Sequence, residues 1–324
     1  MFVNKWTKLF VSIVISVLGL YYSFYNVNLN ELVFHLSSSN ITWIFIGMLL
    51  LILSVIVRAI RWQFMIKSIE LIKIHKLFSA TMIGYFGNAI LPFRMGELLR
   101  AFALSKESSI GTSKAFGSIL LERIIDMLGL VLTMFFFTLL YPFADDTKKI
   151  MFYVGLVTLL ILGFIILLSI KQSTLIKSIE NFSGYQKIEK IIKSILDGLT
   201  SIKDMQNTGV IVLLTILIWS IYYLITWVVG LALGIGLDWI GIGVILIFTS
   251  LAIAVPAAPS AIGTYHAAAI YVLTELFFLD RSISQSFAVV LHAVGFLPLI
   301  TIGAIFFIKS SLRINDISSE KKII

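Results

Sequence analysis

The sequence predicts an all-α fold, a polytopic helix bundle that lies in a membrane. Three observations support this fold class. Hydrophobic residues make up 59% of the 324 residues and charged residues only 13%, whereas globular proteins carry roughly 25% charged residues. The mean hydropathy is +1.02. The apolar residues also fall in runs of about 20, the helix length that crosses a bilayer core about 30 Å thick.

Eight apolar segments are candidates for membrane-spanning helices. The seventh of them along the chain is shorter than the others and follows a proline-glycine break. The apolar runs continue to within about 20 residues of the end, so we expect a single integral membrane domain over 1–324. The segments lie near 9–25, 41–62, 116–141, 150–170, 209–235, 240–256, 285–308 and, for the short one, 264–279.

The basic residues predict that the N and C termini are both cytoplasmic, because loops that retain Lys and Arg usually stay inside. Such residues precede the first segment and follow the second, fourth and last. The net charge of +8 then faces anionic lipid headgroups, so binding to nucleic acid is not needed to explain it. A cytoplasmic amphipathic helix is expected at about 174–205. The connections on the opposite side hold only three basic residues, Lys148, Lys149 and Arg281. These connections are 26–40, 142–149, 236–239 and 280–284.

Residues 78–104 do not form an ordinary span, because Pro92 and three glycines interrupt the helix. Irregular backbone at membrane depth persists only where it is buried in protein or lines a wet cavity. We therefore expect a re-entrant hairpin that enters from the cytoplasmic side.

Three charged residues, Arg94, Glu97 and Arg100, follow this break at intervals of three residues, and Asn88 precedes it. If a helix resumes after Pro92, the three charged side chains form one stripe along it. Two arginines beside one carboxylate leave a surplus positive charge, and the arginine fork matches phosphate oxygens. The stripe therefore predicts a phosphate site. The alternative is an interfacial helix whose charges pair with each other and with headgroups.

Five further charged residues lie in the apolar segments. Glu122 and Asp126 share a helix face, with Arg123 about 100° away. They either contact a substrate directly or form a buried ion network that holds the hairpin. Arg58 and Arg61 share a face at the end of the second segment, where anchoring at the cytoplasmic interface also explains them.

A second break, about 254–266, contains Pro256, Pro259 and Gly263. The helix that restarts there would point unpaired N–H groups into the protein, an arrangement that suits an anion. Paired breaks in the two halves of a transporter-like chain indicate a midplane site. His266 follows the break and is either a satisfied interior histidine or a group that carries protons.

The sequence favours no cofactor and no metal. Cysteine is absent and the four histidines are scattered, which excludes thiolate sites and gives no histidine cluster. Neither a nucleotide-binding loop nor a hydrolase motif is present.

The charged and broken segments together resemble the lysylphosphatidylglycerol synthase transmembrane-region family, also called flippase-like (UPF0104) membrane proteins. The resemblance implies a polytopic protein that handles polar lipids and translocates phospholipid between leaflets. It implies no aminoacylation, because no soluble domain follows residue 308. The matching motifs are Arg58-x-x-Arg61-Trp62, Asn88-x-x-Leu91-Pro92-x-Arg94-x-Gly96-Glu97-x-x-Arg100, Glu122-Arg123-x-x-Asp126 and Pro256-x-x-Pro259-x-x-Ile262-Gly263.

The chain departs from the family pattern at the second break. The family usually has Pro-Gly-Gly-Ile-Gly followed by a glutamate. Here Ser260 and Ala261 replace the glycines, and His266 stands at the glutamate position. No role for that acid can therefore be transferred to this chain.

The leading hypothesis is a lipid translocase or lipid-binding protein that holds an anionic phospholipid, in the cell membrane of a prokaryote. One alternative is a glycosyltransferase that uses a polyprenyl-phosphate donor and an acidic residue in an extracytoplasmic loop. Another is an accessory subunit that recruits a lipid-modifying synthase through 174–205. The acidic candidates for sugar transfer are Glu31, Asp145, Asp146, Asp238 and Asp280.

Overall fold

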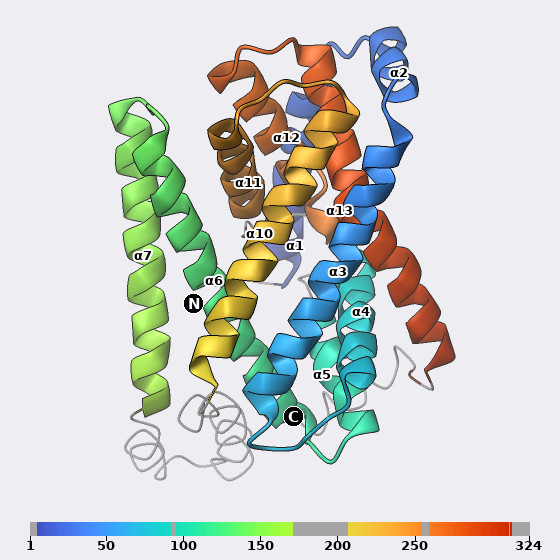
Figure 1. Cartoon of the computed structure of the whole chain (residues 1–324), viewed down its shortest axis with the longest axis vertical. Coiled ribbons are helices and arrows are strands. Elements are labelled where there is room, and N and C mark those ends of the chain that lie inside the picture. The colour runs from blue at the N-terminus through green and yellow to red at the C-terminus, as the bar shows by residue number, and fades with distance from the viewer. Residues whose placement is uncertain (1–4, 92–94, 171–206, 255–258, 311, 313–324) are drawn as a thin grey trace.

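A computed structural model describes residues 5–91, 95–170, 207–254, 259–310 and 312 of the chain (Figure 1). All regular secondary structure within these residues is helical, which confirms the all-α prediction. The amphipathic helix expected at 174–205 lies outside them. The elements are α1 (Lys5–Phe24), α2 (Leu29–Ser37), α3 (Ile41–Ile66), α4 (Ile74–Ile90), α5 (Gly96–Glu107), α6 (Thr112–Leu140), α7 (Asp145–Ile170), α10 (Thr208–Ala232), α11 (Trp239–Ala254), the 3-10 turn η3 (Pro259–Ala261), α12 (Thr264–Tyr271), the π-helical turn η4 (Val272–Leu276) and α13 (Arg281–Lys309).

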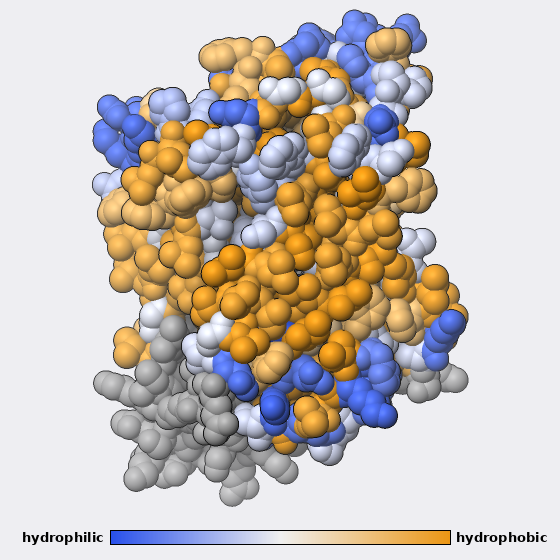
Figure 2. Space-filling model, viewed as in Figure 1, coloured by the Kyte–Doolittle hydropathy of each residue, from blue (hydrophilic) through white to orange (hydrophobic). Residues whose placement is uncertain are grey.

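Five helices in the described part of the chain, α3, α6, α7, α10 and α13, are long and apolar enough to cross a membrane. A 26-residue helix such as α3 is about 39 Å long at 1.5 Å per residue. Large apolar side chains such as Phe45 and Leu132 point outward and are more than 60% exposed. Figure 2 shows an apolar belt around the middle of the molecule, with polar residues gathered toward its two ends. The protein is therefore a multi-pass membrane protein.

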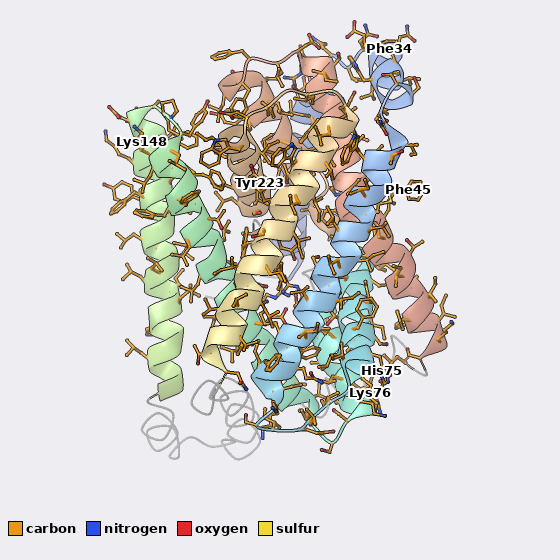
Figure 3. The ribbon with its side chains drawn as sticks, in the orientation of Figure 1. Phe34, Phe45, His75, Lys76, Lys148 and Tyr223 are labelled. Carbon is orange, nitrogen blue, oxygen red and sulfur yellow. The ribbon has the colours of Figure 1, made fainter. Side chains whose placement is uncertain are left out.

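The two ends of the bundle carry different loops. Phe34 of α2 and Lys148 in the first turn of α7 lie at one end, which we call the α2 end (Figure 3). His75 and Lys76 lie at the other, the α5 end. The long helices therefore connect loops that the sequence assigns to opposite sides.

Helices α4 and α5 form a hairpin at the α5 end, over the segment where a re-entrant hairpin is expected (Figure 1). Gly84 and Gly87 were expected to interrupt the helix, but α4 continues through both of them. Together with Gly96 they instead let the two helices approach closely. A Cβ atom on Gly96 would lie only 2.0 Å from the carbonyl oxygen of Gly84, and one on Gly87 would lie 2.9 Å from Gly96 Cα. The Gly96 N–H donates a hydrogen bond to Asn88 Oδ1 at 2.9 Å, which ties the first turn of α5 to the last turn of α4.

Helices α11 and α12 lie in the half of the bundle nearer the α2 end and pack against each other (Figure 1). With 16 and 8 residues, each is too short to cross a bilayer alone. Two apolar segments, near 240–256 and 264–279, were expected to be spans there. Since η3 and α4 also make contact, the two broken elements meet inside the bundle.

We call α11 and α12 the second hairpin. Its backbone adopts an unusual conformation just before α12. Ser260 and Ala261 have φ values of +58° and +54°, and Gly263 has φ +95°. Left-handed backbone costs a residue with a Cβ roughly 1–2 kcal/mol. The two positions at which the chain departs from the glycines of the family pattern are therefore the two that adopt a glycine-like conformation.

The double substitution of Ser260 and Ala261 by glycine is expected to raise the thermal unfolding midpoint in detergent. Glycine adopts the left-handed region at no steric cost, although the greater freedom of the unfolded chain offsets part of this gain. The matched control is Ser113→Gly in the first turn of α6, which should lower the midpoint. A lower midpoint for the double variant would contradict the strained conformation.

Helix α2 was not expected, since 26–40 was interpreted as a connection. The Asn28 side chain accepts hydrogen bonds from the backbone N–H groups of Asn30 and Glu31, at 3.2 and 3.4 Å, and its amide donates to Glu31 Oε1 at 2.9 Å. An Asn with a Glu three residues later resembles a capping box, which signals a helix start. That signal was available in the sequence.

Candidate functional site

A buried cluster of charges joins α3, α5 and α6. Arg58 Nη1 lies 2.5 Å from Glu122 Oε1 and 2.6 Å from Asp126 Oδ2. Arg61 Nη2 lies 2.6 Å from Asp126 Oδ1. Arg58, Arg61 and Glu122 are no more than 3% exposed. Unpaired charges at such depth would be very costly, so the carboxylates of α6 are what allow the arginines of α3 to lie inside the bundle.

Arg100 of α5 completes the cluster on the hairpin side. Its Nη1 and Nη2 atoms donate to Glu122 Oε1 and Oε2 at 3.0 and 2.8 Å, a bidentate pair. The guanidinium carbon lies 3.9 Å from the centroid of the Trp62 ring, which adds a cation–π contact. The Trp62 indole N–H in turn donates to Ser118 Oγ at 3.0 Å. Glu122 and Trp62 therefore fix α5 against α6 and α3.

Arg123 and Glu97 are the most accessible members of the cluster. The Arg123 side chain is 35% exposed and that of Glu97 is 23% exposed, against 16% for Asp126. Arg123 Nε lies 3.5 Å from Glu97 Oε1, and Arg123 Nη1 lies 3.6 Å from Asp126 Oδ2. The shortest contact of Arg123, from Nη2 to Glu122 Oε1, is 3.2 Å. The shortest contacts of the other three arginines are 2.5–2.8 Å, so Arg123 is the least tightly held arginine of the four.

The charges of the described cluster do not cancel. Four guanidinium groups, on Arg58, Arg61, Arg100 and Arg123, face three carboxylates, on Glu97, Glu122 and Asp126. One positive charge is left over. The cluster is therefore suited to an anion that carries a single negative charge.

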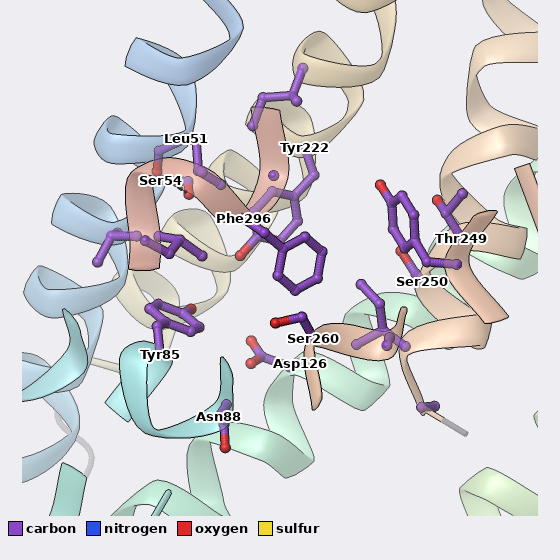
Figure 4. Close-up of a pocket in the computed structure, with 18 of the residues that line it drawn as sticks. Leu51, Ser54, Tyr85, Asn88, Asp126, Tyr222, Thr249, Ser250, Ser260 and Phe296 are labelled. Carbon is purple, nitrogen blue, oxygen red and sulfur yellow. Dashed lines mark hydrogen bonds between the residues drawn. The ribbon is translucent and has the colours of Figure 1, made fainter. Parts of the chain in front are cut away.

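A cavity of about 430 Å³ adjoins this cluster and lies between the two hairpins. Asn88 of α4 and Ser260 of η3 both line it, and Asp126 lies beside them (Figure 4). Its charged lining residues are Arg58, Glu97, Arg123 and Asp126, whereas most of the remaining wall is apolar or aromatic. The cavity thus combines a charged floor toward the α5 end with largely uncharged walls toward the α2 end.

The structure corrects the interpretation of Arg58 and Arg61 as interfacial anchors. Both side chains are buried and paired with carboxylates of α6, and the adjacent Trp62 is fully buried as well. The physical reason is that Glu122 and Asp126 supply countercharges from a helix distant in sequence. Snorkelling to the membrane surface is therefore unnecessary.

The first hairpin distributes its charged residues differently from the expected stripe. Arg94 lies outside the described residues. Glu97 faces Arg123 and lines the cavity, whereas Arg100 is 2% exposed and pairs with Glu122 away from the lining. Glu97 and Arg100 therefore serve different partners on α6.

The second break does not present its helix start to the cavity at Gly263. A Cβ atom there would lie 2.3 Å from the backbone carbonyl oxygen of Ser16, so the backbone of α1 covers this position. Pro259 begins η3. His266 is 7% exposed, and its ring centroid lies 4.6 Å from that of His292. The segment therefore contributes Ser260 and Ala261 to the cavity wall, and neither Gly263 nor His266 is among the lining residues.

Two polar residues of α10 complete the cluster and were not singled out in the sequence. Arg58 Nη2 donates to the Tyr222 hydroxyl at 2.9 Å, and Arg61 Nη1 donates to Thr215 Oγ1 at 3.0 Å. Thr215 and Tyr222 are seven residues apart and so lie on one face of the helix. The seven-residue spacing of these two polar residues in an otherwise apolar helix is the sequence signal that could have identified them.

The acidic residues considered for sugar transfer have local contacts at helix ends. Asp238 Oδ1 accepts the Gly241 N–H at 2.8 Å, and Asp280 Oδ1 accepts the Ser282 N–H at 2.7 Å. Asp146 lies 3.4 Å from Lys149. None of these carboxylates lines the described cavity.

Comparisons with known proteins agree with the motifs. The sequence profile of the lysylphosphatidylglycerol synthase TM region matches residues 9–303. A UPF0104 membrane protein of Methanocaldococcus jannaschii is 26% identical over 223 residues, which cover 68% of this chain and 93% of that protein. Another from the same organism is 25% identical over 278 residues, covering 80% and 82%. No solved structure matches the chain significantly. The chain therefore belongs to the lysylphosphatidylglycerol synthase transmembrane-region family.

Proposed function

We propose that this protein binds an anionic membrane phospholipid through its phosphate group and transfers the lipid between leaflets. The observation that carries the proposal is the cavity between the two hairpins, with its surplus positive charge at one end. A phosphate that crosses hydrocarbon must exchange water for fixed donors. Arginine forks supply such donors in the geometry of phosphate oxygens.

In this proposal Arg123 makes the direct contact with the phosphate. Its side chain lines the cavity and is the most exposed of the cluster, and its shortest ion-pair distance, 3.2 Å to Glu122, exceeds those of the other three arginines. Arg100 and Glu122 act as positioning residues, because they hold α5 and α6 together behind the cavity wall. The acyl chains remain against the apolar surfaces of the bundle and the surrounding lipid.

In this proposal α1 crosses the membrane together with the five long helices α3, α6, α7, α10 and α13, and the α4–α5 and α11–α12 hairpins enter from opposite sides. The eight expected spans would then be six crossings and the two segments of the α11–α12 hairpin. Because a hairpin returns to its own side, both termini stay cytoplasmic, as the positive-inside rule predicts. The α5 end then faces the cytoplasm of a prokaryotic cell, and each leaflet has one hairpin that leads to the cavity.

The test is leaflet transfer of a fluorescent anionic phospholipid in proteoliposomes. The wild-type protein should transfer the lipid faster than protein-free liposomes do. Arg123→Gln should slow transfer about tenfold or more, which corresponds to the loss of about 1.4 kcal/mol of transition-state stabilisation. Arg123→Lys keeps the charge without the planar fork, so its transfer rate should lie between those of the wild-type protein and Arg123→Gln.

Lys149→Gln is the matched control, since it removes one positive charge from an exposed pair at the α2 end. It should transfer lipid at the wild-type rate. Wild-type protein with no rate above that of protein-free liposomes would refute the proposed function. A wild-type rate for Arg123→Gln would refute only the role of Arg123.

A further inference from the structure

We infer that the uncharged end of the cavity selects lipids whose headgroup carries hydroxyl groups and no ammonium group. This inference rests on the proposed function, because it assigns the part of the lipid that lies beyond the phosphate. The observation is a set of hydroxyl side chains that line the cavity on the side of the charged cluster nearer the α2 end. Four of them, Ser54, Thr226, Thr249 and Ser250, come from three different helices.

Two of these hydroxyls lie one helical turn from Arg58 and Tyr222, which are hydrogen-bonded to each other in the charged cluster. Ser54 precedes Arg58 by four residues on α3, and Thr226 follows Tyr222 by four residues on α10. The helices run in opposite directions, so both steps lead toward the α2 end (Figure 1). One turn is about 5.4 Å, which is the scale of a glycerol or small polyol attached to a phosphate.

The opposite wall offers hydroxyls of the same kind. Thr249 and Ser250 of α11 are adjacent, and Figure 4 shows both across the cavity from Tyr222 and Ser54. Thr249 is only 3% exposed, as is Thr226. A headgroup that enters between these walls is therefore contacted from both sides.

Three of these four hydroxyl groups already donate their protons to helix carbonyls. Ser54 donates to the Leu51 carbonyl at 2.6 Å, Thr226 donates to the Tyr222 carbonyl at 3.1 Å, and Thr249 donates to the Ile245 carbonyl at 2.8 Å. Each of these three hydroxyl oxygens can still accept a hydrogen bond through a lone pair. The three hydroxyls therefore match a headgroup that donates hydrogen bonds.

Both hydroxyl and ammonium groups donate, but only ammonium brings a charge. The carboxylates among the described lining residues are Glu97 and Asp126, and both belong to the charged cluster and lie close to arginines. A buried ammonium without a countercharge is costly, whereas a neutral hydroxyl only exchanges one hydrogen bond for another. The geometry therefore favours a glycerol, polyol or sugar headgroup over an amine-bearing one.

The experiment compares three fluorescent lipids with identical acyl chains in proteoliposomes of the full chain. Their headgroups are phosphoglycerol, phosphomethanol and phosphoethanolamine. The first two carry the same charge and differ in their hydroxyls. Wild-type protein should transfer the glycerol lipid about tenfold faster than the methanol lipid, the upper range for one or two added hydrogen bonds, and the ethanolamine lipid most slowly.

The double variant Thr226→Val with Thr249→Val removes both hydroxyls at nearly constant volume, and should bring the glycerol-to-methanol rate ratio close to one. The control is Thr133→Val with Thr158→Val, because these threonines donate to helix carbonyls in the same way but do not line the cavity. It should keep the wild-type ratio.

The outcomes separate the two proposals. Equal wild-type rates for the glycerol and methanol lipids would overturn the headgroup selection while leaving lipid transfer intact, and so would ethanolamine transfer as fast as glycerol transfer. An unchanged ratio in the Thr226 and Thr249 double variant would overturn the assignment of these hydroxyls. No transfer of any of the three lipids above the protein-free rate would refute the proposed function itself.

Discussion

Glu122→Gln is expected to destabilise the protein by about 3–5 kcal/mol, the cost of removing one partner from a buried ion pair. Glu122 is fully buried and accepts from both Arg58 and Arg100. The neutral amide of glutamine removes the countercharge that these two guanidinium groups share. The bonds between α5, α6 and α3 should weaken together.

The measurement is the thermal unfolding midpoint of purified protein in detergent. A loss of this size should lower the midpoint by roughly 10 °C, by analogy with domains of 150–250 residues. Asp146→Asn is the control, because that carboxylate is 92% exposed in its pair with Lys149 and exposed pairs contribute little. A midpoint for Glu122→Gln within about 2 °C of wild type would show that the cluster does not hold these helices together.

Gly96→Val is expected to open the α4–α5 hairpin. The Cβ atom would lie 2.0 Å from the Gly84 carbonyl oxygen and 2.5 Å from both the backbone nitrogen and the Oδ1 atom of Asn88. Two of these three atoms are backbone and cannot rotate away. Overpacking of this kind costs about 1–3 kcal/mol and occasionally more, and the Asn88 hydrogen bond would be lost as well.

Cysteine accessibility measures the opening, since the chain contains no native cysteine. A cysteine at Leu99, which is 2% exposed, should react slowly with a water-soluble maleimide in the parent protein and at least tenfold faster beside Gly96→Val. The control is Gly209→Val in the first turn of α10, where a Cβ atom would have no neighbour within 4 Å. Slow labelling of both variants would indicate that the helices do not approach as closely as described.

Much of the fold could be predicted because its signals are local. The bounds of the long helices α3, α6, α7, α10 and α13 agree with the apolar runs to within about five residues, since hydrophobic length alone sets a membrane helix. An interruption within 78–104 and a second one at about 254–266 were likewise expected, and the helices described there, α4, α5, α11 and α12, are separate elements. Pro and Gly act on their own backbone, which is why such interruptions are visible in the sequence. Helix α2 was missed although its capping residues were visible.

The site could be predicted only in part. Glu97, Arg123, Asp126 and Arg58 were candidate residues, and the structure brings all four to one cavity. The partners of each charge could not be derived, because the residues of α6 and α10 that bind Arg58 and Arg61 are at least 64 residues away in sequence. The relative rotation of the helices sets the pairs. The same holds for the cover that α1 places over Gly263.

The sequence by itself determined that the chain is a multi-pass helical membrane protein with charged residues at two broken segments, because hydropathy, charge and backbone breaks each act over a few neighbouring residues. Only the tertiary structure decided which charges neutralise one another, which one is exposed to the cavity and which hydroxyls face it. Coulomb energies and hydrogen bonds depend on distances of a few ångströms. Those distances are fixed by how the helices pack.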